Sequence, residues 1–94
     1  MIYGQIDIEE EVLEDVEESI KLPKEIVLYN DDHNTFDFVI ESLIKVCRHD
    51  VLQAEQCTFL VHYTGKCAVK RGDYEKLKPM CTALLDRGLT AEIV

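Results

Sequence analysis

The side chains best suited to binding chemistry lie in one short run, Asn30 to Asn34 (NDDHN). Asp31 and Asp32 are adjacent carboxylates, and the run contains no Lys or Arg. Two neighbouring carboxylates without a cationic partner repel each other, so a positive group or water is expected to meet them. The run therefore indicates a site for a cationic ligand.

This polar run lies between a predicted strand and a predicted helix. The preceding residues, Ile26 to Tyr29, are of strand-favouring type. Asn34 is predicted to cap the following helix, expected from about Thr35 to Arg48. Its apolar residues follow the spacing of one helix face and are Phe36, Val39, Ile40, Leu43, Ile44 and Cys47.

A second helix brings His62 toward the same place. It is predicted to begin after the N-cap Asp50 and to end near Gly65. His62 follows Thr58 by four residues, so the two lie on the same helix face one turn apart. The resulting cleft would have a polar lip of Asn30, Asp31, Asp32 and His62. Its apolar floor would consist of Leu28, Phe36, Val39, Thr58 and Val61.

An ammonium group attached to a hydrophobic side chain fits both parts of such a cleft. An α-amino group offers three donors, and an Asn carbonyl, an ionised Asp and a neutral imidazole each accept one of them. Binding is then expected to weaken when His62 becomes protonated. A pocket with an apolar floor and a few convergent polar groups is the usual form of a small-ligand site.

Other interpretations of the same residues stay open. The Asn-Asp-Asp run is also typical of an ordinary turn with a helix cap. A metal site of Asp31, Asp32, His33 and His62 is conceivable by ligand type, but no compact metal motif supports it. Cys57 and His62 diverge around their helix, so no catalytic pair is predicted, and neither is a metal or cofactor.

The composition limits the classes of partner. A chain of 94 residues has room for one small domain. Its formal net charge of -9 argues against nucleic acid and anionic membrane surfaces. No apolar run approaches the ~20 residues that span a bilayer, and no signal peptide is apparent, so a cytoplasmic location is predicted. The cysteines are interpreted as free thiols, and a monomer is expected.

The charge is concentrated at the N-terminus. Eight of the nineteen acidic residues lie at positions 7–18, interleaved with apolar residues. Residues 1–22 are therefore predicted to form a flexible acidic extension. Its alternating acids and apolar residues fit a helix formed against a partner, and equally a solvating tail with no task of its own.

Residues 23–94 are predicted to fold as an α+β domain in the order β-α-α-β-α-β. Three helices would pack on a three-stranded, mostly antiparallel sheet. A short strand is expected over 66–70, with Arg71-Gly72 as a turn. The third helix is expected to begin after Asp73, to present Tyr74 and Leu85 on its apolar face, and to kink or restart at Pro79. A closing strand is expected over 89–93.

These motifs together resemble the ClpS family, adaptors for Clp AAA+ proteases in the N-degron pathway. The first motif is the Asn-Asp-Asp segment from Leu28 to Ile40. The second runs from Ala54 to Lys66 and contains Val-His-Tyr-Thr-Gly, and the end from Gly88 to Ile93 is similar to the family's closing strand. The resemblance covers residues 24–94.

The resemblance implies a non-enzymatic adaptor that binds the free α-amino group and the large first side chain (Leu, Phe, Tyr or Trp) of a substrate. Asn30, Asp32 and His62 then match the amine ligands, with Asp31 supporting them. The residues that match the side-chain pocket are Leu28, Tyr29, Asn34, Phe36, Val39, Thr58, Val61 and Leu89.

The resemblance also implies a Clp-type unfoldase as partner. Its N-terminal domain would dock near Glu75, and the acidic extension would help to hand over the substrate. This chain departs from the bacterial pattern at Asn34-Thr35-Phe36, where Thr-Pro-Met is common, and at Thr58, where Met is common. The smaller Thr58 predicts a pocket that tolerates Ile or Val as well. The alternative is a docking-only modulator of the unfoldase that does not bind N-termini.

Overall fold

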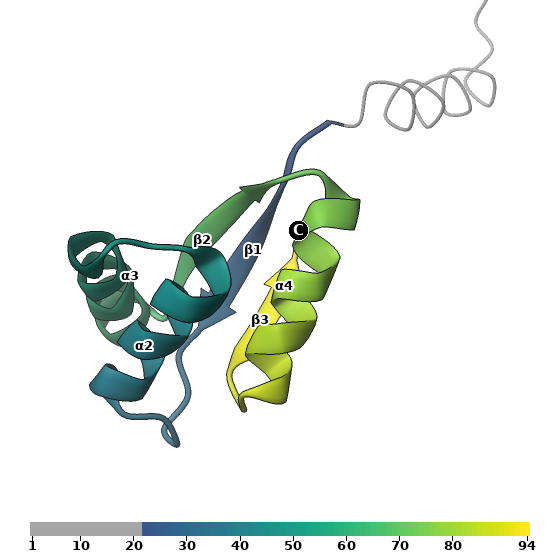
Figure 1. Ribbon diagram of the computed structural model, residues 1–94. Coiled ribbons are helices and arrows are strands. Elements are labelled where there is room, and N and C mark those ends of the chain that lie inside the picture. Colours follow the sequence, from purple (N-terminus) through teal and green to yellow (C-terminus); the bar gives the residue numbers. More distant parts are fainter. Residues whose placement is uncertain (1–21) are drawn as a thin grey trace, which may run out of the picture.

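The computed structural model describes residues 22–94, which form three strands and three helices (Figure 1). Along the chain these are β1 (Lys24–Tyr29), α2 (Phe36–Cys47), α3 (Val51–Thr64), β2 (Lys66–Gly72), α4 (Tyr74–Asp86) and β3 (Thr90–Ile93). The predicted α+β class and β-α-α-β-α-β order are confirmed. The predicted acidic extension lies almost wholly outside the described residues.

The sheet is antiparallel, with β1 between β2 and β3. Along β1, Ile26 and Leu28 are buried, whereas Val27 and Tyr29 on the opposite face are only half-buried. This alternation is the period of two expected when one face of a sheet packs against helices. A register shift between Ile26 and Val27 marks an irregularity opposite β2.

The core lies between the buried face of the sheet and the inward sides of the helices. Fully buried Leu43, Leu77 and Leu84 come from α2 and α4, and Ala54 from α3. Each large aliphatic side chain buried in this way contributes about 1.5–3 kcal/mol. The core therefore holds the ends of β1, α2 and α3 in fixed relation to one another.

One prediction about the helix starts needs correction. The N-cap of α2 is Thr35, whose hydroxyl accepts from Phe38 N–H at 3.1 Å, and not Asn34. Asp73 is the N-cap of α4 as expected, although its side chain makes no cap hydrogen bond. The predicted cap of α3 is confirmed, because Asp50 accepts from Gln53 N–H at 2.7 Å.

Other departures concern β2 and α4. Arg71 and Gly72 belong to β2 instead of forming a turn, because they pair with Glu25 and Lys24 of β1. Helix α4 runs through Pro79 without a restart. Tyr74 and Leu85, expected on its apolar face, are both exposed.

All four cysteines are free. Cys47 and Cys81 are buried, and Cys57 and Cys67 are half-buried. Burial raises the pKa of the Cys47 thiol to about 11 and that of Cys57, with help from its hydrogen bond to Cys67, to about 12. The Cys47 and Cys57 thiols therefore stay protonated at neutral pH and behave as small apolar groups.

Candidate functional site

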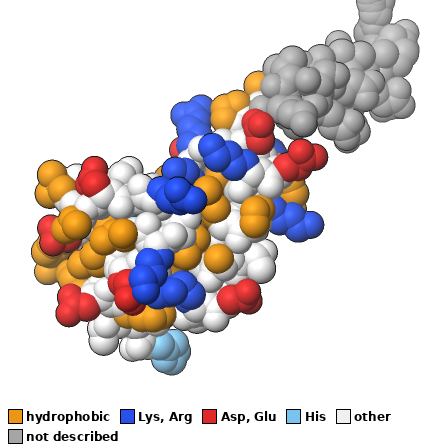
Figure 2. Space-filling view, viewed as in Figure 1, with side chains coloured by type: hydrophobic (Ala, Val, Ile, Leu, Met, Phe, Trp, Pro, Cys, Tyr) orange, Lys and Arg blue, Asp and Glu red, His pale blue; other side chains and the backbone are white. Residues whose placement is uncertain are grey.

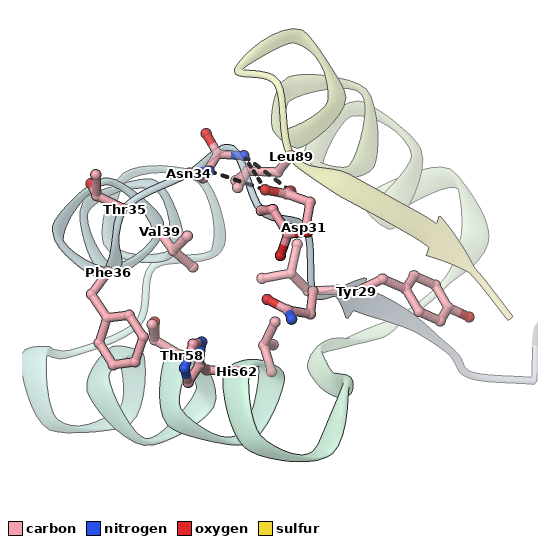
Figure 3. A pocket seen from close by; sticks show the side chains of 13 residues that line it. Tyr29, Asp31, Asn34, Thr35, Phe36, Val39, Thr58, His62 and Leu89 are labelled. Atoms are coloured by element: carbon pink, nitrogen blue, oxygen red, sulfur yellow. Dashed lines mark hydrogen bonds between the residues drawn. The ribbon is translucent and has the colours of Figure 1, made fainter.

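A pocket of about 290 Å³ opens where β1 ends, between the starts of α2 and β3 and the second half of α3 (Figure 3). The structure brings together around it all the substrate-binding residues predicted from the sequence. The full lining is Leu28, Tyr29, Asn30, Asp31, Asp32, Asn34, Thr35, Phe36, Val39, Thr58, Val61, His62 and Leu89.

Asp31 organises the loop on one side of the pocket. Its Oδ1 accepts from the backbone N–H groups of His33 (2.9 Å) and Asn34 (3.1 Å), and both of its oxygens accept from Asn34 Nδ2 (3.1 and 3.0 Å). Partial burial alone would raise the pKa of Asp31, but these hydrogen bonds outweigh it and hold the pKa below its ordinary value. Asp31 is therefore a stable anion that shapes the loop.

Asn34 ties this loop to a distant part of the chain. Its Nδ2 also donates to the carbonyl of Gly88 at 3.0 Å, 54 residues away, just before the pocket residue Leu89. Gly88 has a φ of +90°, a conformation that glycine adopts without strain. The Asn34 amide thus fixes the separation between the loop and the start of β3.

Three exposed polar side chains stand at the lip of the pocket: Asn30, Asp32 and His62. Within residues 22–94, none of their side-chain polar atoms has a hydrogen-bond or ion-pair partner. The backbone of Asn30 is anchored by its N–H, which donates to the Gly65 carbonyl at 2.9 Å. That bond joins the loop to the end of α3, one turn after His62, so acceptors from two elements meet at one lip.

The floor of the pocket is apolar and buried. Leu28 from β1, Val39 from α2, Val61 from α3 and Leu89 each retain under a tenth of their surface. Thr58 is also buried, and its hydroxyl donates to the Ala54 carbonyl at 2.7 Å. Because that hydroxyl is satisfied within α3, the floor presents no unpaired polar group to a bound side chain.

Phe36 forms the wall between the floor and the outside. Its ring meets the His62 ring edge-on, with centroids 5.0 Å apart, and contacts Phe59 at 5.4 Å. Figure 3 shows Phe36 reaching from α2 toward Thr58 and His62 on α3. The aromatic contacts hold this wall in place, since edge-to-face pairs contribute about 0.5–1.5 kcal/mol beyond their buried area.

Tyr29 borders the pocket in a different manner from that predicted. Its side chain points away from the cavity (Figure 3), and its hydroxyl donates to Glu92 Oε1 on β3. The hydrogen bond to this carboxylate raises the pKa of Tyr29. Because successive strand residues face opposite sides, Leu28 enters the pocket and Tyr29 does not.

Thr35 is a lining residue that the sequence analysis did not include. It lies at the rim because it caps α2. A signal for it existed, since Thr is a favoured N-cap residue and directly precedes the apolar stripe of α2.

Glu75 lies apart from the pocket, in the first turn of α4. That turn follows Gly72, which pairs with the first residue of β1, whereas the pocket loop follows the last. The predicted docking surface and the pocket therefore lie at opposite ends of β1.

Residues 22–94 contain no group of three or more His, Cys, Asp or Glu side chains that could hold a metal ion. Among these same residues, no helix has the length and apolar character required to cross a membrane.

Comparison with known proteins decides the family. Residues 22–92 match the sequence profile described as ATP-dependent Clp protease adaptor protein ClpS. The chain belongs to the ClpS family. An ATP-dependent Clp protease adapter protein ClpS from Salmonella gallinarum is 35% identical over 77 residues, which cover 78% of this chain and 73% of that protein. The ClpS of Escherichia coli O127:H6 is 35% identical over the same coverage.

A solved structure has the same fold. Agrobacterium tumefaciens ClpS2 bound to L-phenylalaninamide superposes with a TM-score of 0.75 at 19% identity, covering 79% of this chain and 96% of that one. As a ClpS protein, this chain is an adaptor of the Clp protease and not an enzyme.

Proposed function

We propose that this ClpS protein captures substrates by their free α-amino group and bulky hydrophobic first residue and delivers them to a Clp-type AAA+ unfoldase. The observation that carries the proposal is the pocket itself. Three acceptors without protein partners among residues 22–94, on Asn30, Asp32 and His62, stand directly above a buried apolar floor. An N-terminal Leu, Phe, Tyr or Trp presents three amine donors and an apolar side chain in the same arrangement.

The solved relative supports this assignment. L-Phenylalaninamide, to which Agrobacterium tumefaciens ClpS2 is bound, combines a free α-amino group with an aromatic side chain. A cavity of about 290 Å³ is of the size that holds one such side chain. Thr58 on the floor, smaller than Met, leaves space that a β-branched Ile or Val would also use.

Delivery would use other parts of the molecule. Docking on the N-terminal domain of the unfoldase is assigned to the start of α4, around Glu75, at the end of β1 away from the pocket. The acidic residues at positions 7–18 would help to hand the substrate over.

Binding of short fluorescent peptides, followed by anisotropy, tests capture. Peptides beginning with Phe, Leu or Ile are expected to bind, and Ala and N-acetyl-Phe peptides are not. Charged hydrogen bonds contribute about 1.5–3 kcal/mol each, so loss of the amine charge should weaken binding at least about tenfold. Asp32→Asn should weaken Phe-peptide binding similarly.

Asp37→Asn is the matched control. Asp37 is also an exposed acid near the loop, but it does not line the pocket. It should leave the affinity within about twofold, because an exposed carboxylate that does not line the pocket cannot hydrogen-bond the amine bound there. Equal binding of acetylated and free peptides would refute amine recognition. Binding to no peptide would favour the docking-only modulator.

A further inference from the structure

A row of aromatic side chains continues from the wall of the pocket onto the outer side of α3. Phe36, which lines the pocket, contacts Phe59 at 5.4 Å between ring centroids. Phe59 in turn stacks on Tyr63, with centroids 5.7 Å apart and planes inclined by 9°. His62 of the pocket lip meets the Tyr63 ring edge-on at 4.9 Å. Two pocket residues, Phe36 and His62, are therefore also members of this row.

The outer members of the row, Phe59 and Tyr63, are exposed to solvent and are not part of the buried core. Phe59 is 50% exposed and Tyr63 is 72% exposed. Leu52 and Leu60 are also exposed on this helix, and exposed Gln53, Glu55 and Gln56 separate Leu52 from the aromatic row. Figure 2 shows hydrophobic side chains gathered at the α3 end of the molecule.

We propose that Phe59 and Tyr63 form a second subsite that takes an apolar, above all aromatic, side chain at the second residue of the captured N-terminus. This inference rests on the proposed function. The occupant follows from continuity, since the subsite shares Phe36 and His62 with the first-residue pocket.

The length of one peptide unit and the charges near the lip both favour an apolar second side chain at this subsite. Consecutive Cα atoms are about 3.8 Å apart, so a chain whose first residue fills the pocket places its second side chain just outside the lip. The aromatic row begins at that lip with ring centroids 4.9–5.7 Å apart. Asp32 at the lip and Glu55, one turn before Phe59, make an acidic second residue unfavourable there.

Peptides that share Leu as first residue and differ only at the second (Phe, Ser or Asp) test the subsite. With the full chain, the Leu-Phe peptide should bind about three- to tenfold more tightly than Leu-Ser, the range that aromatic pairing supplies. Leu-Asp should bind more weakly than Leu-Ser. The ratio of the Leu-Ser to the Leu-Phe dissociation constant should fall toward one in Phe59→Ser and Tyr63→Ser.

Leu52→Ser is the matched control, because Leu52 is 64% exposed on the same helix but lies seven residues before Phe59. It should keep both dissociation constants and their ratio. A wild-type ratio of one, or a ratio that survives both aromatic substitutions, overturns the subsite. If Leu-Ser still binds in that case, only the subsite fails, whereas binding of none of the three peptides overturns the proposed function as well. Self-association of the full chain that Phe59→Ser abolishes, with a ratio of one, would assign this face to a second copy.

Discussion

At the scale of single residues, the side chain of Asp31 makes more hydrogen bonds than any other side chain of the pocket among residues 22–94, and its proposed role is to support the amine ligands. It accepts from two backbone N–H groups and from the Asn34 amide, and its pKa is lowered by them. Asp31→Asn removes the charge and places an amide donor against donors. We expect the free energy of unfolding to fall by about 1–2 kcal/mol at neutral pH, measured by urea denaturation.

The stabilisation by Asp31 is expected to depend on pH. The pKa of Asp31 is lower in the folded state than its ordinary value of 3.8, so its stabilisation is present above that value and is lost as the pH falls through the folded-state pKa. The difference between wild type and Asp31→Asn should therefore narrow as the pH falls below 3.8 and through the lowered pKa of Asp31. Asp32→Asn, one residue on at an exposed position, should leave stability unchanged throughout. A difference that persisted into strong acid would contradict this account.

Sequence could predict the lip of the pocket, because the residue types and the four-residue spacing of Thr58 and His62 already place acceptors above an apolar face. It could also have excluded the Tyr29 side chain, since Leu28 and Tyr29 must face opposite sides of a strand. The sequence could not predict the hydrogen bond from the Asn34 side chain to the Gly88 carbonyl. That bond depends on how two segments 54 residues apart pack, and no local pattern records it.

At the scale of elements, the turn after α3 sets the position of His62 relative to the loop. Gly65 ends α3 with a φ of +97°, and its carbonyl accepts from Asn30 N–H. An added Cβ meets no atom within 4 Å, so the cost of Gly65→Ala is backbone strain alone, about 1–2 kcal/mol. We expect lower thermal stability and several-fold weaker binding of a Phe peptide, because strain here shifts Asn30 against His62.

Gly72→Ala is the comparison for that variant. Its Cβ would lie 3.7 Å from side-chain atoms of Leu77 and Lys76, an ordinary contact, and its φ is not positive. Such a substitution is expected to be neutral or to stabilise by up to about 1 kcal/mol. Equal destabilisation by both variants would show that loss of a glycine, and not the left-handed turn, is responsible.

The periodicity of the apolar residues predicted which helices and strands form. It predicted less well where each of them begins and ends. Thr35 replaced Asn34 as cap because Asn34 is engaged by Asp31 and Gly88. Arg71 and Gly72 extended β2 because β1 begins at Lys24 and offers them partners. In both cases a tertiary contact overrode a local preference, which is why sequence reasoning defines the type of an element better than its boundary.

At the scale of the whole molecule, the pocket proposed for capture and the surface proposed for docking lie at opposite ends of β1. The pocket loop follows Tyr29, whereas α4 follows Gly72, which pairs with Lys24 at the other end of the strand (Figure 1). A six-residue strand spans about 20 Å, whereas the Debye length at physiological salt is about 8 Å. Charged residues at the start of α4 should therefore affect peptide capture only weakly.

Deletion of residues 1–21 is expected to separate the two steps. The core, the sheet and the pocket all lie within residues 22–94, so the shortened chain should fold and bind a Phe peptide within about twofold of the full chain at physiological salt. Degradation of a Phe-starting substrate by a Clp unfoldase and its protease should nevertheless fall at least about tenfold. The reason is that the acidic residues proposed to hand over the substrate are missing. Asp32→Asn in the full chain should lose both activities, since its defect lies in capture. Undiminished degradation by the shortened chain would instead assign residues 1–21 to solvation alone, and delivery would then rest on the docking surface at α4.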